Sequence, residues 1–243
     1  MPRSLRFVIP CLALALAACA TAPTSDYKSI IASADRSDAD RVIDRRRNPE
    51  LLLAFAGVRP GMRVLEMGAG GGYTAELLAR TVGPNGTVYA HEFPGQMARF
   101  LQAYDERAKK PVMKNVVRML RPFDDPVTTD AGNLDAITFF FSYHDTTFLE
   151  VDRAKMNRAL FNALKPGGRL VVADHAAVAG AGIGVGKSLH RIEESVVRRE
   201  IEAAGFRLEA VGEFLRNPWD PRTERIFGQN VPVDEFVLRY VKP

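Results

Sequence analysis

Three glycines at alternate positions follow an acidic residue in the stretch VLEMGAGGGYT, which covers residues 64–74. Gly68, Gly70 and Gly72 have no Cβ atom, so a turn through them lets backbone N–H groups approach a ligand closely. The residues before this turn predict a buried strand, and those after it predict a helix whose N-terminus faces the same ligand. This combination is typical of a site for a nucleotide or for a nucleoside-containing cofactor.

Glu66, two residues before the first glycine, helps to distinguish between these cofactors. A carboxylate buried at a strand end is costly unless it meets a cationic or hydrogen-bonding partner. The ammonium group of S-adenosylmethionine (SAM) would provide that partner, whereas a pyrophosphate would be repelled. We therefore predict that SAM is the cofactor and that Glu66, Gly68, Gly70 and Gly72 bind it.

Two other glycine patterns suggest different ligands. The dinucleotide fingerprint G-x-G-x-x-G fails at its third glycine, where this sequence has Tyr73. The stretch GAGIGVGKS (residues 180–188) ends like a phosphate-binding P-loop, but that motif requires a glycine where Ala181 stands. We expect residues 180–188 to form a mobile glycine-rich loop near the strand ends rather than a triphosphate site.

Candidate catalytic residues lie in FFFSYHD (residues 139–145), at the end of a predicted strand. Methyl transfer requires a positioned nucleophile and sometimes a base that removes its proton. We assign His144 as that base because its ordinary pKa is near neutrality, with Asp145 fixing its tautomer. Tyr143 would donate a hydrogen bond or line the pocket. The alternative is that His144 caps the following helix or packs structurally.

The remaining histidines have simpler interpretations. Asp174 and His175 form a second polar pair, for which we expect a structural role, although His175 stays a candidate. His190 and Arg191 are expected to start a helix, where they either close over the site or are solvated. His91 is expected at a strand end near the cofactor.

Alternating strands and helices must position these residues. The predicted strands cover residues 62–67, 87–91, 115–120, 134–141, 169–173, 206–215 and 236–241. The predicted helices cover residues 49–56, 73–82, 96–110, 148–164 and 192–204, with Asn48 as the N-cap of the first. This alternation predicts an α/β fold with a Rossmann-like, doubly wound, mostly parallel sheet of seven strands. The last strand is expected to be antiparallel, because no helix joins the final two.

The glycine stretch resembles motif I of the class I SAM-dependent methyltransferases, and the resemblance covers roughly residues 48–243. It implies that Glu92, at the end of the second strand, holds the ribose hydroxyls and that Asp124 or Asp125 contacts the adenine. LKPGGRLVV (residues 164–172) is similar to the family's turn into its fifth strand. We therefore expect a single SAM-methyltransferase-like domain over residues 36–243.

Composition limits the partners and the kinds of site. The formal net charge is +4, and removal of a segment carrying Arg3 and Arg6 would leave +2 (4 − 2), which is too little to argue for nucleic acid. The two cysteines, Cys11 and Cys19, both lie near the N-terminus, so the body is expected to lack disulfides, thiolate metal sites and a cysteine nucleophile.

Two missing patterns narrow the reaction further. We assign no metal site, because the metal-ligand arrangement of catechol methyltransferases is not seen, although the scattered aspartates do not exclude a metal. The Asn/Asp-Pro-Pro-Tyr pattern of methyltransferases that act on base or glutamine amides is also missing, so we expect a small-molecule acceptor. Trp219, in the polar connection 216–234, would either shape the acceptor pocket or be exposed.

The N-terminus predicts export. Residues 1–6 are basic, and the apolar run that follows them, 7–17, is too short to span a bilayer. Its end, Leu16-Ala17-Ala18-Cys19, resembles the bacterial lipobox, which implies a signal peptide over residues 1–18 and lipidation of Cys19. The alternative is an ordinary cleaved signal with a chance cysteine.

A lipidated Cys19 would anchor the protein to a membrane, with residues 19–35 as a polar tether. Ala20 resembles the pattern for sorting to the outer membrane, so we expect a periplasm-facing lipoprotein of the cell envelope. SAM is not obviously supplied there, so two hypotheses remain: a membrane-tethered methyltransferase, or a catalytically silent binding protein with the same fold. The presence of Glu66, the three glycines and Glu92 favours the enzyme.

Overall fold

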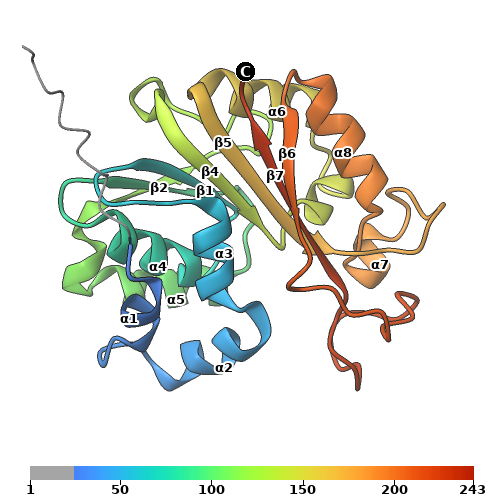
Figure 1. The fold of residues 1–243 in the computed structure, drawn as a ribbon, viewed down its shortest axis with the longest axis horizontal. Helices are drawn as coiled ribbons and strands as arrows, with labels where there is room; N and C mark the ends of the chain where they lie inside the picture. The colour runs from blue at the N-terminus through green and yellow to red at the C-terminus, as the bar shows by residue number, and fades with distance from the viewer. Residues whose placement is uncertain (1–24) are drawn as a thin grey trace, which may run out of the picture.

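Seven strands form one sheet in the computed structural model, which describes residues 25–243 (Figure 1). The strands are β1 (Arg63–Met67), β2 (Thr87–Glu92), β3 (Val116–Leu120), β4 (Leu134–Phe140), β5 (Leu164–His175), β6 (Arg207–Gly212) and β7 (Glu235–Val241). Their order is β3-β2-β1-β4-β5-β7-β6. Strand β7 is antiparallel to β5 and β6, and the other neighbours are parallel. The predicted fold class is confirmed. The signal peptide, Cys19 and the start of the tether lie outside the described residues.

Helices cover both faces of this sheet. They are α1 (Tyr27–Ala32), α2 (Asp38–Arg47), α3 (Pro49–Ala56), α4 (Tyr73–Val82), α5 (Ala98–Ala108), α6 (Arg153–Ala163), α7 (Gly186–Leu189) and α8 (Glu194–Ala203), with 3₁₀ turns η1 (Pro111–Asn115), η2 (Thr129–Ala131) and η3 (His144–Thr147). Successive side chains of a strand point to opposite faces. In β1, Val64 therefore joins the apolar cluster with α3 and α4, whereas Leu65 joins the cluster with α6 and α8.

Local caps explain two differences from the predicted elements. Helix α6 begins at Arg153 rather than at residue 148, because the Asp152 side chain accepts the N–H of Lys155 at 2.9 Å and starts the helix there. Helix α3 begins at Pro49 as predicted, but Asn48 makes no side-chain capping bond to the described chain. Its left-handed backbone (φ 45°) instead ends α2.

Helix α1 lies in the segment predicted as a polar tether. The hydroxyl of Tyr27 donates to the carbonyl of Val58 at 2.8 Å, and Ile30 and Ile31 pack against the apolar cluster of α3 and α4. Residues 27–32 therefore belong to the packed domain rather than to a tether, because these three side chains give the short helix an apolar face.

Strand β1 lies between β2 and β4 in the sheet. The strand order changes direction between β1 and β4, because the chain returns from β3 at the edge to form β4 beside β1. In an open α/β sheet, ligands bind beyond the carboxyl ends of the strands at such a switch point. The turn after β1, Glu92 at the end of β2, and the residues after β4 therefore meet at one edge of the sheet.

Arg107 on α5 connects the turn after β1 to the surrounding helices. Its Nε donates to the carbonyl of Gly71 at 2.9 Å, and its guanidinium donates to both carboxylate oxygens of Asp40 on α2 at 2.7 and 2.8 Å. It also pairs with the buried carboxylate of Glu76 on α4. Buried charges are tolerated when they are paired in this way, so this network fixes the glycine turn against three helices.

Candidate cofactor and acceptor site

All three predicted glycines have a left-handed backbone, with φ values of 67°, 56° and 75° for Gly68, Gly70 and Gly72. A Cβ atom on Gly68 would lie 2.5 Å from Oγ of Ser142, and one on Gly72 would lie 3.0 Å from the ring of Tyr104. At Gly70 the nearest atoms would be 4.0 Å away. Close packing therefore requires the outer two glycines, whereas the middle one borders open space that a ligand could fill.

Two buried carboxyl groups flank this turn. Glu66 and Glu92 are 4% and 0% exposed, and one oxygen of each has no hydrogen-bond partner among residues 25–243. Burial and the neighbouring Glu92 raise the pKa of Glu66 to about 8. Burial raises the pKa of Glu92 to about 7. Such unpaired oxygens are costly unless a ligand brings donors to them.

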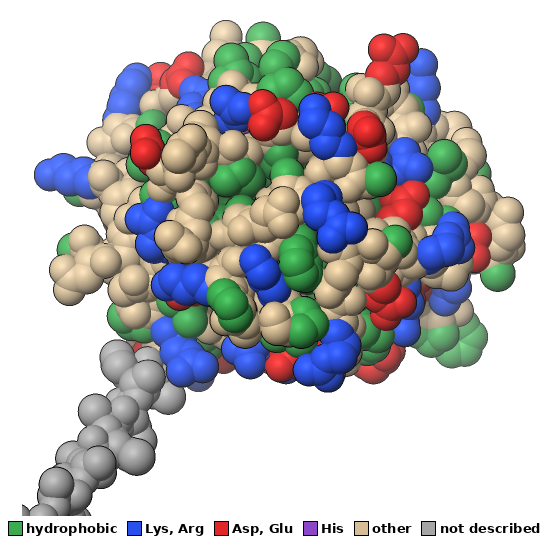
Figure 2. Space-filling view, turned by 90° about the horizontal axis from the view of Figure 1, so that it is seen from above, with side chains coloured by type: hydrophobic (Ala, Val, Ile, Leu, Met, Phe, Trp, Pro, Cys, Tyr) green, Lys and Arg blue, Asp and Glu red, His purple; other side chains and the backbone are tan. Residues whose placement is uncertain are grey.

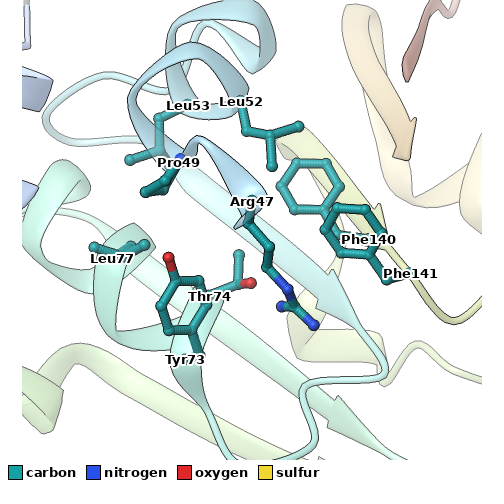
Figure 3. A pocket seen from close by; sticks show the side chains of 9 residues that line it. All are labelled: Arg47, Pro49, Leu52, Leu53, Tyr73, Thr74, Leu77, Phe140 and Phe141. Atoms are coloured by element: carbon teal, nitrogen blue, oxygen red, sulfur yellow. The ribbon is translucent and has the colours of Figure 1, made fainter. Parts of the chain in front are cut away.

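Arg47, at the end of α2, brings a cation to the same region. Its guanidinium lies 4.6 Å from the ring centre of Phe141 and 5.4 Å from that of Tyr73, and Figure 3 shows it between these side chains. Burial, together with repulsion by Arg46, lowers the pKa of Arg47 to about 10. Its buried Nε donates to no atom of the described chain, so a ligand carboxylate would stabilise it.

These groups fit SAM as a set. The space at Gly70 allows close approach to the backbone, the carboxyl of Glu66 would meet the ammonium group, and the carboxyl of Glu92 would meet the ribose hydroxyls. Arg47 would meet the carboxylate of the methionine portion. The assignment of the acids and glycines to the cofactor stays a prediction, supported by their orphaned oxygens and the open space, and Arg47 is an addition that the sequence did not suggest.

The raised pKa of Glu66 predicts how stability depends on pH. The protonated form is favoured in the folded chain, so this stabilisation is complete below the ordinary pKa of 4.5 and is lost as the pH rises through about 8. We expect wild type to lose unfolding free energy relative to Glu66→Gln by up to about 1.4 kcal/mol per pH unit in that range. Urea unfolding of both chains across the range measures this difference.

The comparison with Glu66→Gln isolates Glu66 together with its effect on the neighbouring Glu92. Other groups with shifted pKa values, such as His91 and His144, are common to both chains and cancel in the difference. A difference in unfolding free energy that does not change with pH would contradict the buried, protonated state of Glu66.

His91, at the end of β2, supports the glycine turn from behind. Its Nδ1 accepts the N–H of Gly68 at 3.4 Å, and its Nε2 donates to the carbonyl of Arg121 at 3.0 Å. Burial lowers the pKa of His91 to about 4, so the ring is neutral and its tautomer is fixed by these two bonds. His91 lies near the cofactor turn, as expected, but acts on the backbone of the turn.

The acids after β3 are engaged with basic side chains. Asp124 lies with Oδ2 3.4 Å from Nζ of Lys155 on α6, and Asp125 pairs with Arg121. Between β3 and these acids the buried ring is that of Phe123. The adenine contact assigned to Asp124 stays a prediction, and it would require Asp124 to share its carboxylate with Lys155.

His144 and Asp174 form a buried dyad at the carboxyl ends of β4 and β5. Nδ1 of His144 donates to Asp174 at 2.8 Å, and the backbone N–H of His144 donates to the other carboxylate oxygen at 2.7 Å. Nε2 lies 3.2 Å from Oδ1 of Asp145. Burial opposes a charge on this ring, but the carboxylates of Asp174 and Asp145 outweigh it and raise the pKa of His144 to about 10.

This raised pKa changes the role expected for His144. At neutral pH the ring already holds a proton, so His144 alone is not ready to act as a base. The half-exposed carboxylate of Asp145 lies beside Nε2 of His144. The structure therefore brings His144 and Asp145 together, and Asp174 fixes the orientation of the ring.

Tyr143 does not belong to this site. Its hydroxyl donates to Glu200 at 2.9 Å and accepts from the amide of Asn157 at 2.8 Å, within the core formed with α6 and α8. The chain turns after β4 at Phe141, whose backbone is left-handed (φ 60°), and Tyr143 then enters the core. The prediction that Tyr143 donates to the substrate or lines the pocket is wrong, because both functions of its hydroxyl are used internally.

His175 has the structural role expected of it. Its backbone N–H donates to Asp174 at 2.8 Å, and its Nδ1 donates to the carbonyl of His190 at 3.1 Å. Burial lowers the pKa of His175 to about 3, so the ring is neutral. It therefore holds Asp174 and His190 in place beside His144.

The segment around His190 differs from the predicted helix start. His190 follows α7 with a left-handed backbone (φ 55°), and α8 begins only at Glu194. Arg191 is fully buried and pairs with Asp220 at 2.8 Å, so it is not solvated. His190 is brought to the site, with its Nδ1 3.2 Å from Nε2 of His144.

The glycine-rich loop 180–188 is held by an internal carboxylate. The N–H groups of Gly180 and Gly182 donate to Oε2 of Glu193 at 3.0 and 2.9 Å. Backbone N–H groups in such a loop can bind a phosphate only while they have no other anionic partner. The loop therefore does not form a triphosphate site.

The surface carries no single-sign patch on the face drawn in Figure 2, where basic and acidic side chains are interspersed with hydrophobic ones. Trp219 is 83% exposed, so the structure supports an exposed position for it rather than a place in the acceptor pocket.

Among the helices of residues 25–243, none combines the length and the apolar character that crossing a membrane requires.

Strand order and cofactor cradle together define the class I methyltransferase fold. A SAM-dependent methyltransferase from Aquifex aeolicus superposes with a TM-score of 0.61 at 22% identity, over 90% of this chain and 100% of that one. Fibrillarin from Aeropyrum pernix, solved with natively bound SAM, gives a TM-score of 0.50 at 20% identity, over 76% of this chain and 68% of that one. At these identities the likeness establishes the fold.

Sequence comparison establishes the family. A family model described as a methyltransferase domain matches residues 59–203, more than half of the chain. The chain therefore carries a class I SAM-dependent methyltransferase domain, and the methyl donor that this family implies is SAM.

Two curated relatives resemble part of the chain. The ubiquinone/menaquinone biosynthesis C-methyltransferase UbiE of Teredinibacter turnerae is 33% identical over 125 residues, 49% of this chain and 45% of that protein. The protein-L-isoaspartate O-methyltransferase of Thermotoga maritima is 30% identical over 122 residues, 50% of this chain and 34% of that protein. The chain thus spans less than half the length of these relatives.

Proposed function

We propose that this methyltransferase acts on a small molecule whose nucleophile lies beside His144 and Asp145, and that it works as a lipoprotein tethered through Cys19. One observation carries the first part. The dyad of His144 and Asp174 lies at the same sheet edge as the glycine turn, where a Cβ on Gly68 would touch Ser142, two residues before His144.

The side chains at this edge divide the work between holding and proton transfer. SAM, when bound, supplies a methyl group on a positively charged sulfur and so brings its own leaving group. Glu66, Glu92 and Arg47 would hold it through the polar atoms that have no partner among residues 25–243. Positioning of this kind can account for much of the rate. Asp145 would take the proton of the acceptor, with His144 holding its carboxylate in place.

A groove beside the site supports a small acceptor. It has a volume of about 530 Å³ and lies between α2 and the segment that leads into β7. Arg46 and Glu235 line it, 3.1 Å apart, and the guanidinium of Arg46 lies 5.7 Å from the ring centre of Phe141. Ligand pockets for small molecules usually have volumes of about 300–1,000 Å³.

The acceptor is tested directly, because the two named relatives are called a quinone-biosynthesis C-methyltransferase and an isoaspartate O-methyltransferase. The full chain is supplied with SAM carrying a labelled methyl group and with a panel of phenols, carboxylic acids and amines. We expect label in at least one small molecule. Tight SAM binding without transfer to any panel member or to a cell-envelope extract would favour the silent binding protein instead.

Lipidation is tested by changing one cysteine at a time. We expect Cys19→Ser to lose incorporated fatty acid and to move from the membrane fraction to the soluble fraction, because the cysteine sulfur would carry the lipid and the acyl chains would supply the membrane anchor. Cys11→Ser is the matched control and should keep both properties. Fatty-acid label that persists in Cys19→Ser would contradict the lipoprotein assignment, and with it the proposed location at the cell envelope.

A further inference from the structure

Three side chains with metal-binding atoms meet beside the proposed acceptor position. They are His144 and Asp145 in η3, and His190 after α7, and we call them the His–Asp–His cluster. Nε2 of His144 lies 3.2 Å from Oδ1 of Asp145 and 3.2 Å from Nδ1 of His190, and the last two atoms are 3.9 Å apart. The three atoms therefore form a small triangle.

We propose that the His–Asp–His cluster binds one divalent transition-metal ion and leaves a coordination position open for an oxygen atom of the methyl acceptor. The part of this inference that concerns the acceptor rests on the proposed function. The part that concerns the metal rests on the cluster alone.

The size of the triangle fits a metal ion. Ligand atoms bound to Zn²⁺ at about 2.0–2.1 Å in tetrahedral geometry are about 3.4 Å apart. The observed separations, from 3.2 to 3.9 Å, bracket that value. Three protein ligands are also the number found in catalytic zinc sites, where water or substrate fills the fourth position.

The chemistry of the ligands selects the kind of ion. Two imidazole nitrogens and one carboxylate oxygen suit Zn²⁺, Co²⁺ or Fe²⁺, whereas Mg²⁺ and Ca²⁺ prefer all-oxygen sites. Asp145 and His190 are half-buried, so an ion or a substrate can reach the site from their side. His144 is only 2% exposed and closes the opposite side.

A second layer of contacts orients the ligands. Metal-binding histidines usually donate their other ring N–H to a carboxylate, which fixes the tautomer. Nδ1 of His144 donates in this way to Asp174, which is itself held by two backbone N–H groups, those of His144 and His175. The Nε2 atom of His144 is thereby directed at Asp145 and His190.

His190 is also held in a defined position. Its left-handed backbone is uncommon for a residue other than glycine and persists where the surroundings fix it. The next residue, Arg191, is anchored in the interior by Asp220. Nε2 of His190 faces the exposed Arg225 at 3.3 Å, and metal binding at Nδ1 would place the ring proton on Nε2, so Arg225 must turn away.

A second group of three, His144, Asp174 and His175, is a poorer candidate. All three residues are at most 2% exposed, so no position is open to a substrate. Nδ1 of His144 already donates to Asp174, and Nδ1 of His175 donates to the carbonyl of His190. These bonds support the His–Asp–His cluster instead of forming a separate site.

The metal would give the acceptor two advantages. A bound cation lowers the pKa of a coordinated hydroxyl group, and it fixes the position of that oxygen. Because Asp145 would then be bound to the metal, the proton released from the hydroxyl would pass to water rather than to Asp145. The metal would take the place of the proton on Nε2 of His144, which points at a carboxylate and an imidazole.

The metal is tested on the full chain, stripped with a chelator and titrated with Zn²⁺ by calorimetry. We expect one ion per chain. Asp174→Asn should weaken binding about 10–100-fold, and His190→Ala and Asp145→Asn should weaken it at least as much. Glu224→Gln, an exposed acid next to Arg225, is the matched control and should leave the affinity unchanged, and Arg225→Gln should leave it unchanged or tighter. Melting temperatures confirm that each variant is folded.

Co²⁺ reports on the open position. We expect its visible absorption to indicate nitrogen and oxygen ligands and to change when azide is added. Absence of stoichiometric Zn²⁺ or Co²⁺ binding, binding that His190→Ala leaves unaltered, or a Co²⁺ spectrum that azide does not change would overturn the inference. The stripped chain should still bind SAM, so lost SAM binding would count against the proposed function and not against the metal site.

Discussion

Replacement of Gly70 with aspartate is expected to abolish SAM binding while the fold is retained. A Cβ at this position meets no atom closer than 4.0 Å, so the protein itself does not reject it. The backbone is left-handed (φ 56°), a conformation that aspartate adopts more readily than most residues. The added side chain would instead occupy the space that a ligand needs, and its charge would repel the carboxylate of SAM.

Calorimetry with SAM measures this effect. We expect wild type to bind in the micromolar range, roughly −8 kcal/mol, and Gly70→Asp to bind at least about 1,000-fold more weakly, a loss of about 4 kcal/mol. Gly61→Asp is the matched control: it also has a left-handed backbone (φ 81°) and open space around its Cβ, but it lies in the turn before β1. Wild-type affinity in Gly70→Asp would show that the cofactor lies elsewhere.

Replacement of His144 with glutamine is expected to reduce turnover about 100- to 10,000-fold, the range for lost assistance to proton transfer, because His144 holds the carboxylate of Asp145 in place. SAM affinity should change by less than about twofold, because the cradle formed by Glu66, Gly70 and Glu92 remains. Glutamine can still donate to Asp174, so the buried carboxylate keeps a partner. Turnover is followed as transfer of the labelled methyl group, and binding as the calorimetric affinity.

The neighbouring residue provides the control. Tyr143→Phe removes a hydroxyl that bonds to Glu200 and Asn157, so it should lower the unfolding free energy by about 1–2 kcal/mol and leave turnover nearly unchanged. Equal losses of turnover in His144→Gln and Tyr143→Phe would indicate that both act through stability. Full turnover in His144→Gln would exclude His144 from the reaction.

Local sequence signals predicted the parts of the molecule that local structure decides. Helices α3 and α4 begin and end where the sequence placed them, because proline and glycine fix their ends. The glycine turn was predictable for the same reason, since its left-handed backbone needs glycine whatever surrounds it. The mostly parallel direction of the strands followed from the alternation of strands and helices, and the antiparallel end is confirmed in β7.

Contacts between distant segments could not be predicted in this way. Strands β1 to β4 lie between Arg47 and Phe141 in the sequence, although the two side chains are in contact. Nothing around Arg47 in the chain marks it as a ligand-binding residue. His190 meets His144 across 46 residues, which only the packing of α7 on η3 brings together. The prediction for Tyr143 was wrong because the backbone turns at the left-handed Phe141. After this turn, Tyr143 points into the core and His144 points to the site.

The proposed metal site also could not be predicted from the sequence, which led us to assign none. Only one sequence-adjacent pair, His144 and Asp145, contributes to the His–Asp–His cluster, and a single pair carries little information about a metal. The supporting carboxylate, Asp174, comes from another strand, and it was assigned only a structural role. Side chains that the fold gathers from three segments leave no spacing pattern for a motif to capture.

The long connection between β6 and β7, residues 216–234, stabilises a buried charge in the interior. Arg191 is wholly enclosed, and its counter-charge, Asp220, comes from that connection, as does the carbonyl of Glu224 that its Nε also contacts. A shortened homologue or an engineered deletion across residues 216–234 would strand a guanidinium in an apolar interior, an arrangement that costs several kcal/mol, about 3–5 when one partner of a buried pair is lost. Shortening of this connection would therefore require a simultaneous substitution of Arg191. The position of the adjacent His190 would change as a result.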